Sequence, residues 1–106
     1  MTERPTYPWS ACAVPFCRRR SRRFRPGEEW LCGEHWRLVD RALKTFWRKR
    51  LQTLYLRWAK AKAIHDATPT RDAWMAERST ARRWHRTRDL LWRRMKRQAV
   101  ERSAGL

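Results

Sequence analysis

Apolar residues recur every three or four positions along most of the chain beyond residue 35, which is the spacing that one face of an α-helix produces. A first run extends from about 33 to 66, with no proline and no glycine after Gly33. Trp36, Trp47 and Trp58 are eleven residues apart, so they are predicted to lie nearly in line on that face. The opposite face is basic and carries Arg37, Arg41, Lys44, Arg48, Lys49, Lys60 and Lys62.

A second helix is predicted over about 69–103. Thr68 is a suitable N-cap, Pro69 suits the first helical position, and Asp72 suits the first turn. The apolar stripe that follows contains Trp74, Ala81, Trp84, Leu91, Trp92, Met95 and Ala99. Two long helices joined by a short turn predict an antiparallel helical hairpin, with residues 36–106 forming one continuous domain behind a small N-terminal module.

The N-terminal module, residues 1–35, has no helical periodicity. Residues 1–11 hold two prolines and are predicted to be an extended lead-in. Pro26-Gly27 is a strong turn signal, and the aromatic Phe24 and Trp30 on either side of it favour a short β-hairpin there. The predicted fold class is therefore mainly α, with a small finger that leads into the helical hairpin.

Four potential metal ligands lie within this module in the pattern C-x4-C-x14-C-x2-H: Cys12, Cys17, Cys32 and His35. Two closely spaced pairs of thiolate and imidazole ligands are typical of a structural zinc site. The alternatives are a Cys12–Cys17 disulfide with Cys32 free, or three inert thiols. An odd number of cysteines and the lack of a secretory segment argue against disulfides, so we predict one structural Zn²⁺.

Cys32 and His35 fall three positions apart at the start of a predicted helix, after a cysteine knuckle and a hairpin. In this order of elements, residues 12–35 resemble a treble-clef zinc finger, and the resemblance covers about a quarter of the chain. Treble clefs bind nucleic acids or proteins, and in HNH nucleases they form the catalytic core. The chain has no asparagine and no spare histidine next to the site, so the resemblance implies binding rather than nuclease activity.

The charge balance points to a polyanionic partner. The chain has 27 Lys and Arg residues against 10 Asp and Glu, a net charge of +17 that is spread along its whole length. Self-repulsion at this level destabilises a compact state, and binding to a polyanion offsets it. Nothing resembles a signal peptide, and no apolar run approaches the about 20 residues of a membrane span, so we expect a cytoplasmic protein with no membrane partner.

Arginine makes up 22 of the 27 basic residues, and its guanidinium group pairs with phosphate through two parallel hydrogen bonds. We predict nucleic-acid binding, with DNA favoured, through the finger and the first helix. The predicted contacts are Arg18, Arg19, Arg20, Arg22, Arg23, Arg25, Lys44, Arg48 and Lys49. The alternative is a solvated loop whose charge offsets the anionic Cys3His site, but six arginines exceed what that offset needs.

The eight tryptophans allow a second hypothesis. A helix pair has a thin core, so Trp58, Trp74 and Trp92 are predicted to mark a surface for self-association or for a protein partner. In that case the chain is a regulator or inhibitor that docks its hairpin on a nucleic-acid machine, such as RNA polymerase or a defence nuclease. Small Arg- and Trp-rich zinc proteins resemble accessory proteins of phages and mobile elements, including proteins that package nucleic acid.

No catalytic constellation is apparent. The acidic residues are scattered, no glycine-rich phosphate loop occurs, and four protein ligands leave zinc no open position. His65 and His85 have no second ligand at helical spacing and are predicted to be surface or packing residues. We expect a binding protein rather than an enzyme.

Overall fold

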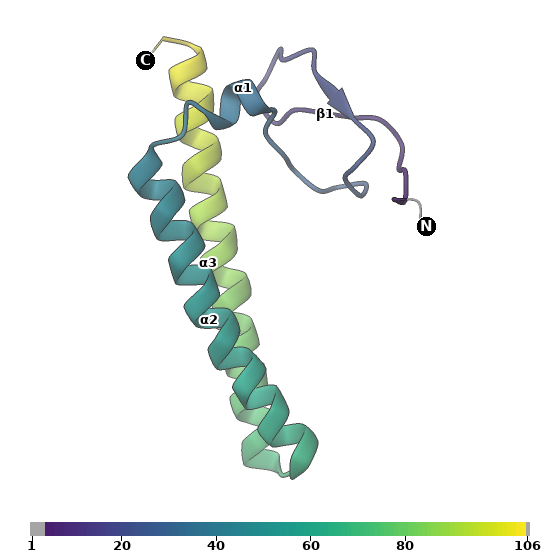
Figure 1. Ribbon diagram of the computed structural model, residues 1–106, viewed down its shortest axis with the longest axis vertical. Coiled ribbons are helices and arrows are strands. Elements are labelled where there is room, and N and C mark those ends of the chain that lie inside the picture. Colours follow the sequence, from purple (N-terminus) through teal and green to yellow (C-terminus); the bar gives the residue numbers. More distant parts are fainter. Residues whose placement is uncertain (1–3, 106) are drawn as a thin grey trace. The chain divides into compact units, whose positions relative to one another are not determined.

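Two long helices make up most of the protein (Figure 1). The computed structural model describes residues 4–105. Helix α2 spans Arg41–Ala67 and helix α3 spans Arg71–Ser103, while a single helical turn, α1, covers Gly33–Trp36. None of these helices is both long and apolar enough to span a membrane.

The chain forms two compact units. One contains residues 41–94, and the other combines residues 4–40 with residues 95–105. Helix α3 therefore contributes to both units, with its last turns belonging to the same unit as the N-terminal segment.

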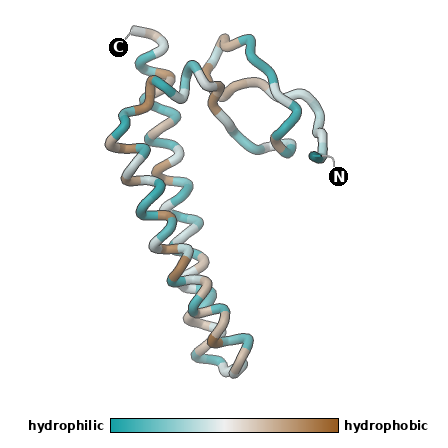
Figure 2. The backbone as a smooth tube through the Cα atoms, viewed as in Figure 1, coloured by the Kyte–Doolittle hydropathy of each residue, from teal (hydrophilic) through white to brown (hydrophobic). Residues whose placement is uncertain are grey.

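In the unit 41–94, helices α2 and α3 run antiparallel, as the two apolar stripes predict. Apolar positions recur along both helices between hydrophilic ones (Figure 2). Leu43, Leu54 and Leu91 are buried, and Trp58 lies against Trp84 with ring centroids 5.7 Å apart. Burial of these apolar surfaces supplies the main stabilisation of the helix pair, because helix propensity alone contributes little.

The start of α3 differs from the prediction by two residues. The N-cap is Thr70 rather than Thr68, because the Thr70 hydroxyl accepts a hydrogen bond from the backbone N–H of Ala73 at 3.1 Å. Pro69 precedes the cap instead of occupying the first helical position. Proline disfavours helical geometry in the residue before it, so Thr68 remains in the connection.

Replacing Thr70 with alanine is expected to lower the free energy of unfolding by about 1 kcal/mol, because the first turn of α3 loses its side-chain cap. The Thr68→Ala variant is the matched control, since the Thr68 side chain does not cap the helix, and it should unfold close to the wild type. Urea denaturation monitored by circular dichroism measures both. A larger loss in the Thr68 variant would contradict the assignment of the cap.

The predicted continuous helix over 33–66 is wrong, because the chain turns between α1 and α2. The N–H groups of Leu38 and Val39 donate to the carbonyls of His35 and Trp36, three residues back. These are the hydrogen bonds of a 3₁₀ turn, and they end the helix after α1. Two side chains of α3 then bind the freed backbone, with Arg102 donating to the Leu38 carbonyl at 2.6 Å and the Gln98 amide oxygen accepting from the Asp40 N–H at 3.0 Å. These contacts replace the hydrogen bonds of a continuing helix.

A two-stranded antiparallel hairpin is present at the N-terminus, but its position differs from the prediction. Strand β1 (Ser10–Ala11) pairs with β2 (Arg20–Ser21), with Ser10 opposite Ser21 and Ala11 opposite Arg20. The hairpin therefore flanks the cysteine knuckle rather than the Pro26-Gly27 turn. The mainly helical fold class with an N-terminal hairpin is confirmed.

The Pro26-Gly27 turn is also present. The Glu28 N–H donates to the Arg25 carbonyl at 3.0 Å. Pro26 occupies the first central position of this type II turn, and Gly27 occupies the second, where its φ of 84° is required. Phe24 and Trp30 stack across the loop with centroids 5.2 Å apart and rings 4° from parallel. The β-hairpin predicted around this turn is therefore absent, and the stacked rings of Phe24 and Trp30 close the loop without strand pairing.

Candidate metal centre

Four side chains from two segments meet in the unit that contains the N-terminal hairpin. Cys12 and Cys17 lie on the knuckle that β1 and β2 enclose, where the Cys17 N–H bonds the Val14 carbonyl at 3.2 Å and the Cys12 N–H bonds the Arg19 carbonyl at 3.1 Å. These two bonds turn the chain back on itself, so both sulfurs face the same point.

The second pair comes from α1. Cys32 is the N-cap residue, with extended backbone, and its carbonyl accepts from the Trp36 N–H at 2.8 Å. Its sulfur is one of the four potential ligand atoms of the cluster. His35 follows three residues later, which places its ring on the same side of the turn.

The ligand atoms lie close enough together to hold one metal ion. The Nδ1 atom of His35 lies 3.1 Å from the sulfur of Cys32 and 3.6 Å from that of Cys12, the sulfurs of Cys17 and Cys32 are 4.0 Å apart, and all four atoms lie within 4.8 Å of one another. Zinc bonds of about 2.3 Å to sulfur and about 2.0 Å to nitrogen give tetrahedron edges of about 3.5–3.8 Å. All three cysteines are free thiols, so the alternative Cys12–Cys17 disulfide is absent.

The surroundings of the cluster favour a cation. Cys12 and Cys32 are each 6% exposed, and the backbone N–H of Cys32 donates to the Cys12 sulfur at 3.3 Å. Burial raises the pKa of the Cys17 thiol. Burial also opposes ionisation of Cys32, but the backbone N–H of His35 and the neighbouring thiols outweigh it and lower the pKa of Cys32. A bound cation would stabilise the thiolate form of cysteines in such a buried position.

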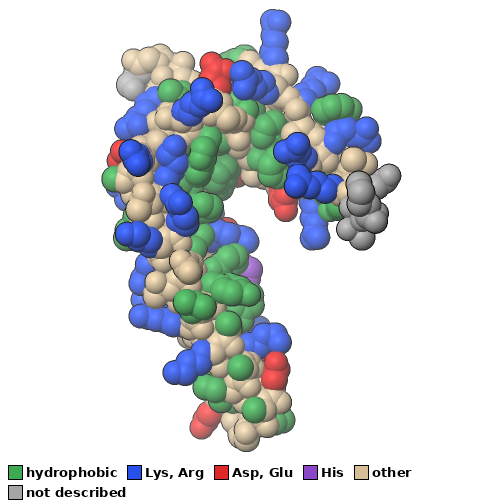
Figure 3. All heavy atoms as spheres, in the orientation of Figure 1, with side chains coloured by type: hydrophobic (Ala, Val, Ile, Leu, Met, Phe, Trp, Pro, Cys, Tyr) green, Lys and Arg blue, Asp and Glu red, His purple; other side chains and the backbone are tan. Residues whose placement is uncertain are grey.

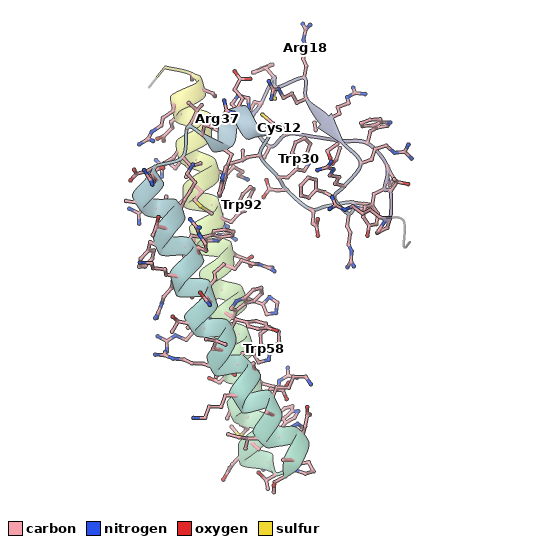
Figure 4. The ribbon with its side chains drawn as sticks, in the orientation of Figure 1. Cys12, Arg18, Trp30, Arg37, Trp58 and Trp92 are labelled. Atoms are coloured by element: carbon pink, nitrogen blue, oxygen red, sulfur yellow. The ribbon has the colours of Figure 1, made fainter. Side chains whose placement is uncertain are left out.

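The six predicted finger arginines are all exposed, but they are not equivalent. Arg19 pairs with Glu34 at 3.0 Å. Arg22 donates to the Tyr7 carbonyl at 3.0 Å, and hydrogen bonding to the Tyr7 side chain raises the pKa of Arg25. The three others have no hydrogen-bond or ion-pair partner for their side chains within residues 4–105: Arg18, Arg20 and Arg23. Arg18 points away from the rest of the finger into solvent (Figure 4).

Further basic side chains lie on the helices (Figure 3). Arg48 and Lys49 are exposed on α2, as predicted, whereas Lys44 is half-buried. A further basic surface lies on α3 and was not among the predicted contacts. There Arg78, Arg82, Arg83 and Arg86 line a hollow of about 580 Å³ together with Trp74 and Met75. The four-residue spacing of Arg78, Arg82 and Arg86 is a signal that could have identified this surface.

The three tryptophans that were predicted to mark a partner surface differ in their surroundings. Trp58 is half-buried and contacts Trp84 and His85, so much of its ring packs within the hairpin (Figure 4). Trp92 is half-buried, and Trp74 is 47% exposed.

The other two histidines take part in packing and pairing. His85 contacts the rings of both Trp58 and Trp84, and His65 Nδ1 lies 3.4 Å from the carboxylate of Glu77. Within residues 4–105, the Cys3His cluster is the single group that could hold a metal ion.

The fold and the cluster together define a small, mainly helical protein with a partly buried Cys3His group compatible with zinc binding. No protein-family model, no curated protein and no solved structure matches the chain.

Proposed function

We propose that this protein binds nucleic acid, with DNA favoured, through the arginine-rich segment of a zinc finger formed by residues 12–35. The observation that carries the proposal is the exposure of Arg18, Arg20 and Arg23 without side-chain partners among residues 4–105. Such guanidinium groups are free to form bidentate hydrogen bonds with phosphate, and they release counterions from nucleic acid when they bind. Arg48 and Lys49 add charge on α2, and the α3 hollow adds more.

The proposed cofactor is one structural Zn²⁺ held by Cys12, Cys17, Cys32 and His35. Three sulfurs and one imidazole nitrogen at these separations are the donor set that tetrahedral zinc prefers. The ion ties the two ends of the arginine-rich segment together, so the guanidinium groups are held in place before nucleic acid binds. Four protein ligands leave no open coordination position, which supports a regulatory accessory role rather than catalysis.

The salt dependence of binding tests this proposal directly. If about six phosphates are contacted on duplex DNA, a plot of log K against log salt concentration should have a slope of about −5. Fluorescence anisotropy of a labelled duplex, titrated at several salt concentrations, measures it. Affinity that does not change with salt would contradict a phosphate-binding function.

A second candidate function is the binding of a protein component of a nucleic-acid machine through the unit 41–94. The favouring observation is a set of apolar side chains that are about half exposed: Tyr55, Leu56, Ile64, Trp74, Met75 and Leu90. A hollow of about 380 Å³ also lies beside Tyr55 and Trp58, and it is lined by more apolar than polar surface. Exposed apolar patches of this kind are typical of interaction sites.

Affinity capture from a lysate separates the two functions. Under the leading proposal, nuclease treatment should release everything that the immobilised protein retains. Under the second, a specific protein should remain after nuclease treatment and should be lost when Leu56 and Met75 are replaced by serine. Retention of a protein by the wild type and by the serine variant alike would contradict the docking surface.

A further inference from the structure

Phe16 occupies an unusual position on the knuckle between the two cysteines. Its side chain is fully exposed, at 101%, and its φ is 67°. A bulky residue rarely adopts a positive φ, and an aromatic ring gains nothing from exposure to water. The exposed ring adds no buried apolar surface to the finger, so it is available to a binding partner.

The ring is presented by a constrained piece of backbone. Cys17 follows Phe16 directly, and Cys12 lies at the start of the same knuckle. The Cys17 N–H bonds the Val14 carbonyl at 3.2 Å, and Val14 itself is buried, at 4% exposed. The ring is therefore held outward by the turn that forms the candidate metal centre.

The surface around Phe16 is both hollowed and basic. A hollow of about 680 Å³ lies beside the ring, and Val14 and Pro15 contribute apolar surface to its lining. Arg18, Arg19 and Glu34 also line it. Glu34 pairs with Arg19 at 3.0 Å, whereas Arg18 has no side-chain partner among the described residues and leaves the hollow with an uncompensated positive charge. A second exposed ring, Trp9 at 63%, precedes β1, with the Arg22 guanidinium 5.6 Å from its centroid.

We propose that Phe16 stacks on an unpaired base, so that the finger binds single-stranded nucleic acid or single-stranded regions in preference to duplex; this deepens the function proposed above and rests on it. Aromatic side chains beside arginines bind single strands because every base offers a π-face and every linkage a phosphate. In a duplex the bases are already stacked and paired, so an outward ring finds no partner. Charge complementarity selects this occupant, since the arginines around the ring favour a polyanion.

The test compares a labelled oligothymidine with a labelled duplex of equal length in the Phe16→Asn variant of the full chain. Asparagine tolerates a positive φ better than phenylalanine does, so metal content and melting temperature should be retained or improved. Affinity for the single strand should fall by about 5- to 150-fold, as on removal of one stacking aromatic. Affinity for the duplex should be unchanged.

Three further variants make the outcome decisive. Phe16→Leu keeps an apolar side chain without a planar ring and should lose single-strand affinity, whereas Phe16→Trp should retain it. Phe46→Ala is the matched control, because Phe46 is a 54% exposed phenylalanine on α2, and it should bind like the wild type. An equal loss on both nucleic acids, or no loss on either, would overturn the stacking role while leaving the proposed function intact. If the wild type binds neither the oligothymidine nor the duplex, both the stacking role of Phe16 and the proposed nucleic-acid binding are overturned.

Discussion

Replacing Cys32 with serine is expected to abolish metal binding and to unfold residues 12–35. Cys32 is close to the three other ligands. Its sulfur lies 3.1 Å from His35 Nδ1 and 4.0 Å from the Cys17 sulfur, and its N–H donates to the Cys12 sulfur. Structural zinc sites bind with apparent free energies of about 10–16 kcal/mol, and much of that stabilises the fold. Metal analysis after dialysis should show loss of zinc, and trypsin should cleave the arginine-rich segment rapidly.

Two histidine variants serve as controls for this result. His35→Cys preserves four ligands and should retain the metal, whereas His65→Ala removes an imidazole that lies outside the cluster and should leave the metal content unchanged. Chelation of the wild type should reproduce the Cys32→Ser behaviour. A serine variant that stays resistant to trypsin and melts like the wild type would show that no structural metal is present.

Replacing Arg18, Arg20 and Arg23 together with alanine is expected to make the slope of log K against log salt concentration shallower by about 2 to 3. Each phosphate contact contributes about 0.7 to the magnitude of this slope on single strands and about 0.9 on duplex DNA. These three side chains are exposed and make no hydrogen bonds or ion pairs with residues 4–105, so their loss should leave the fold intact. Anisotropy titrations at several salt concentrations give the slope, and the melting temperature gives the stability.

The matched variant replaces Arg78, Arg82 and Arg86 on α3, which removes the same charge from another basic surface. A change of slope in the finger variant and a smaller one in the α3 variant would identify the finger as the main contact. The reverse result would move the contact surface to α3. An unchanged slope in both would remove the case for phosphate binding by either surface.

The sequence predicted the candidate metal centre well because the ligands come in two local pairs. Spacing within each pair, Cys12 with Cys17 and Cys32 with His35, is enough to predict that they share a site. The two long helices were also predictable, since their apolar stripes are continuous over many turns.

Features that depend on distant contacts were not predictable in the same way. The break between α1 and α2 depends on Gln98 and Arg102, which are about 60 residues away in the sequence. The strands pair around the knuckle rather than around Pro26-Gly27 because stacking of Phe24 on Trp30 closes that loop instead. Of the six finger arginines, the sequence could not show which three are engaged by Tyr7 and Glu34.

The candidate metal centre lies near one end of the chain, but its unit is completed by residues from the other end. Glu29 binds Lys96 at 2.6 Å, and the Asp40 and Leu38 backbones are held by Gln98 and Arg102. During synthesis the cysteines would leave the ribosome long before these partners exist. Residues 4–40 can therefore reach their final fold only after residues 96–102 have been synthesised, and a fragment cut after Asp40 would lack these stabilising contacts.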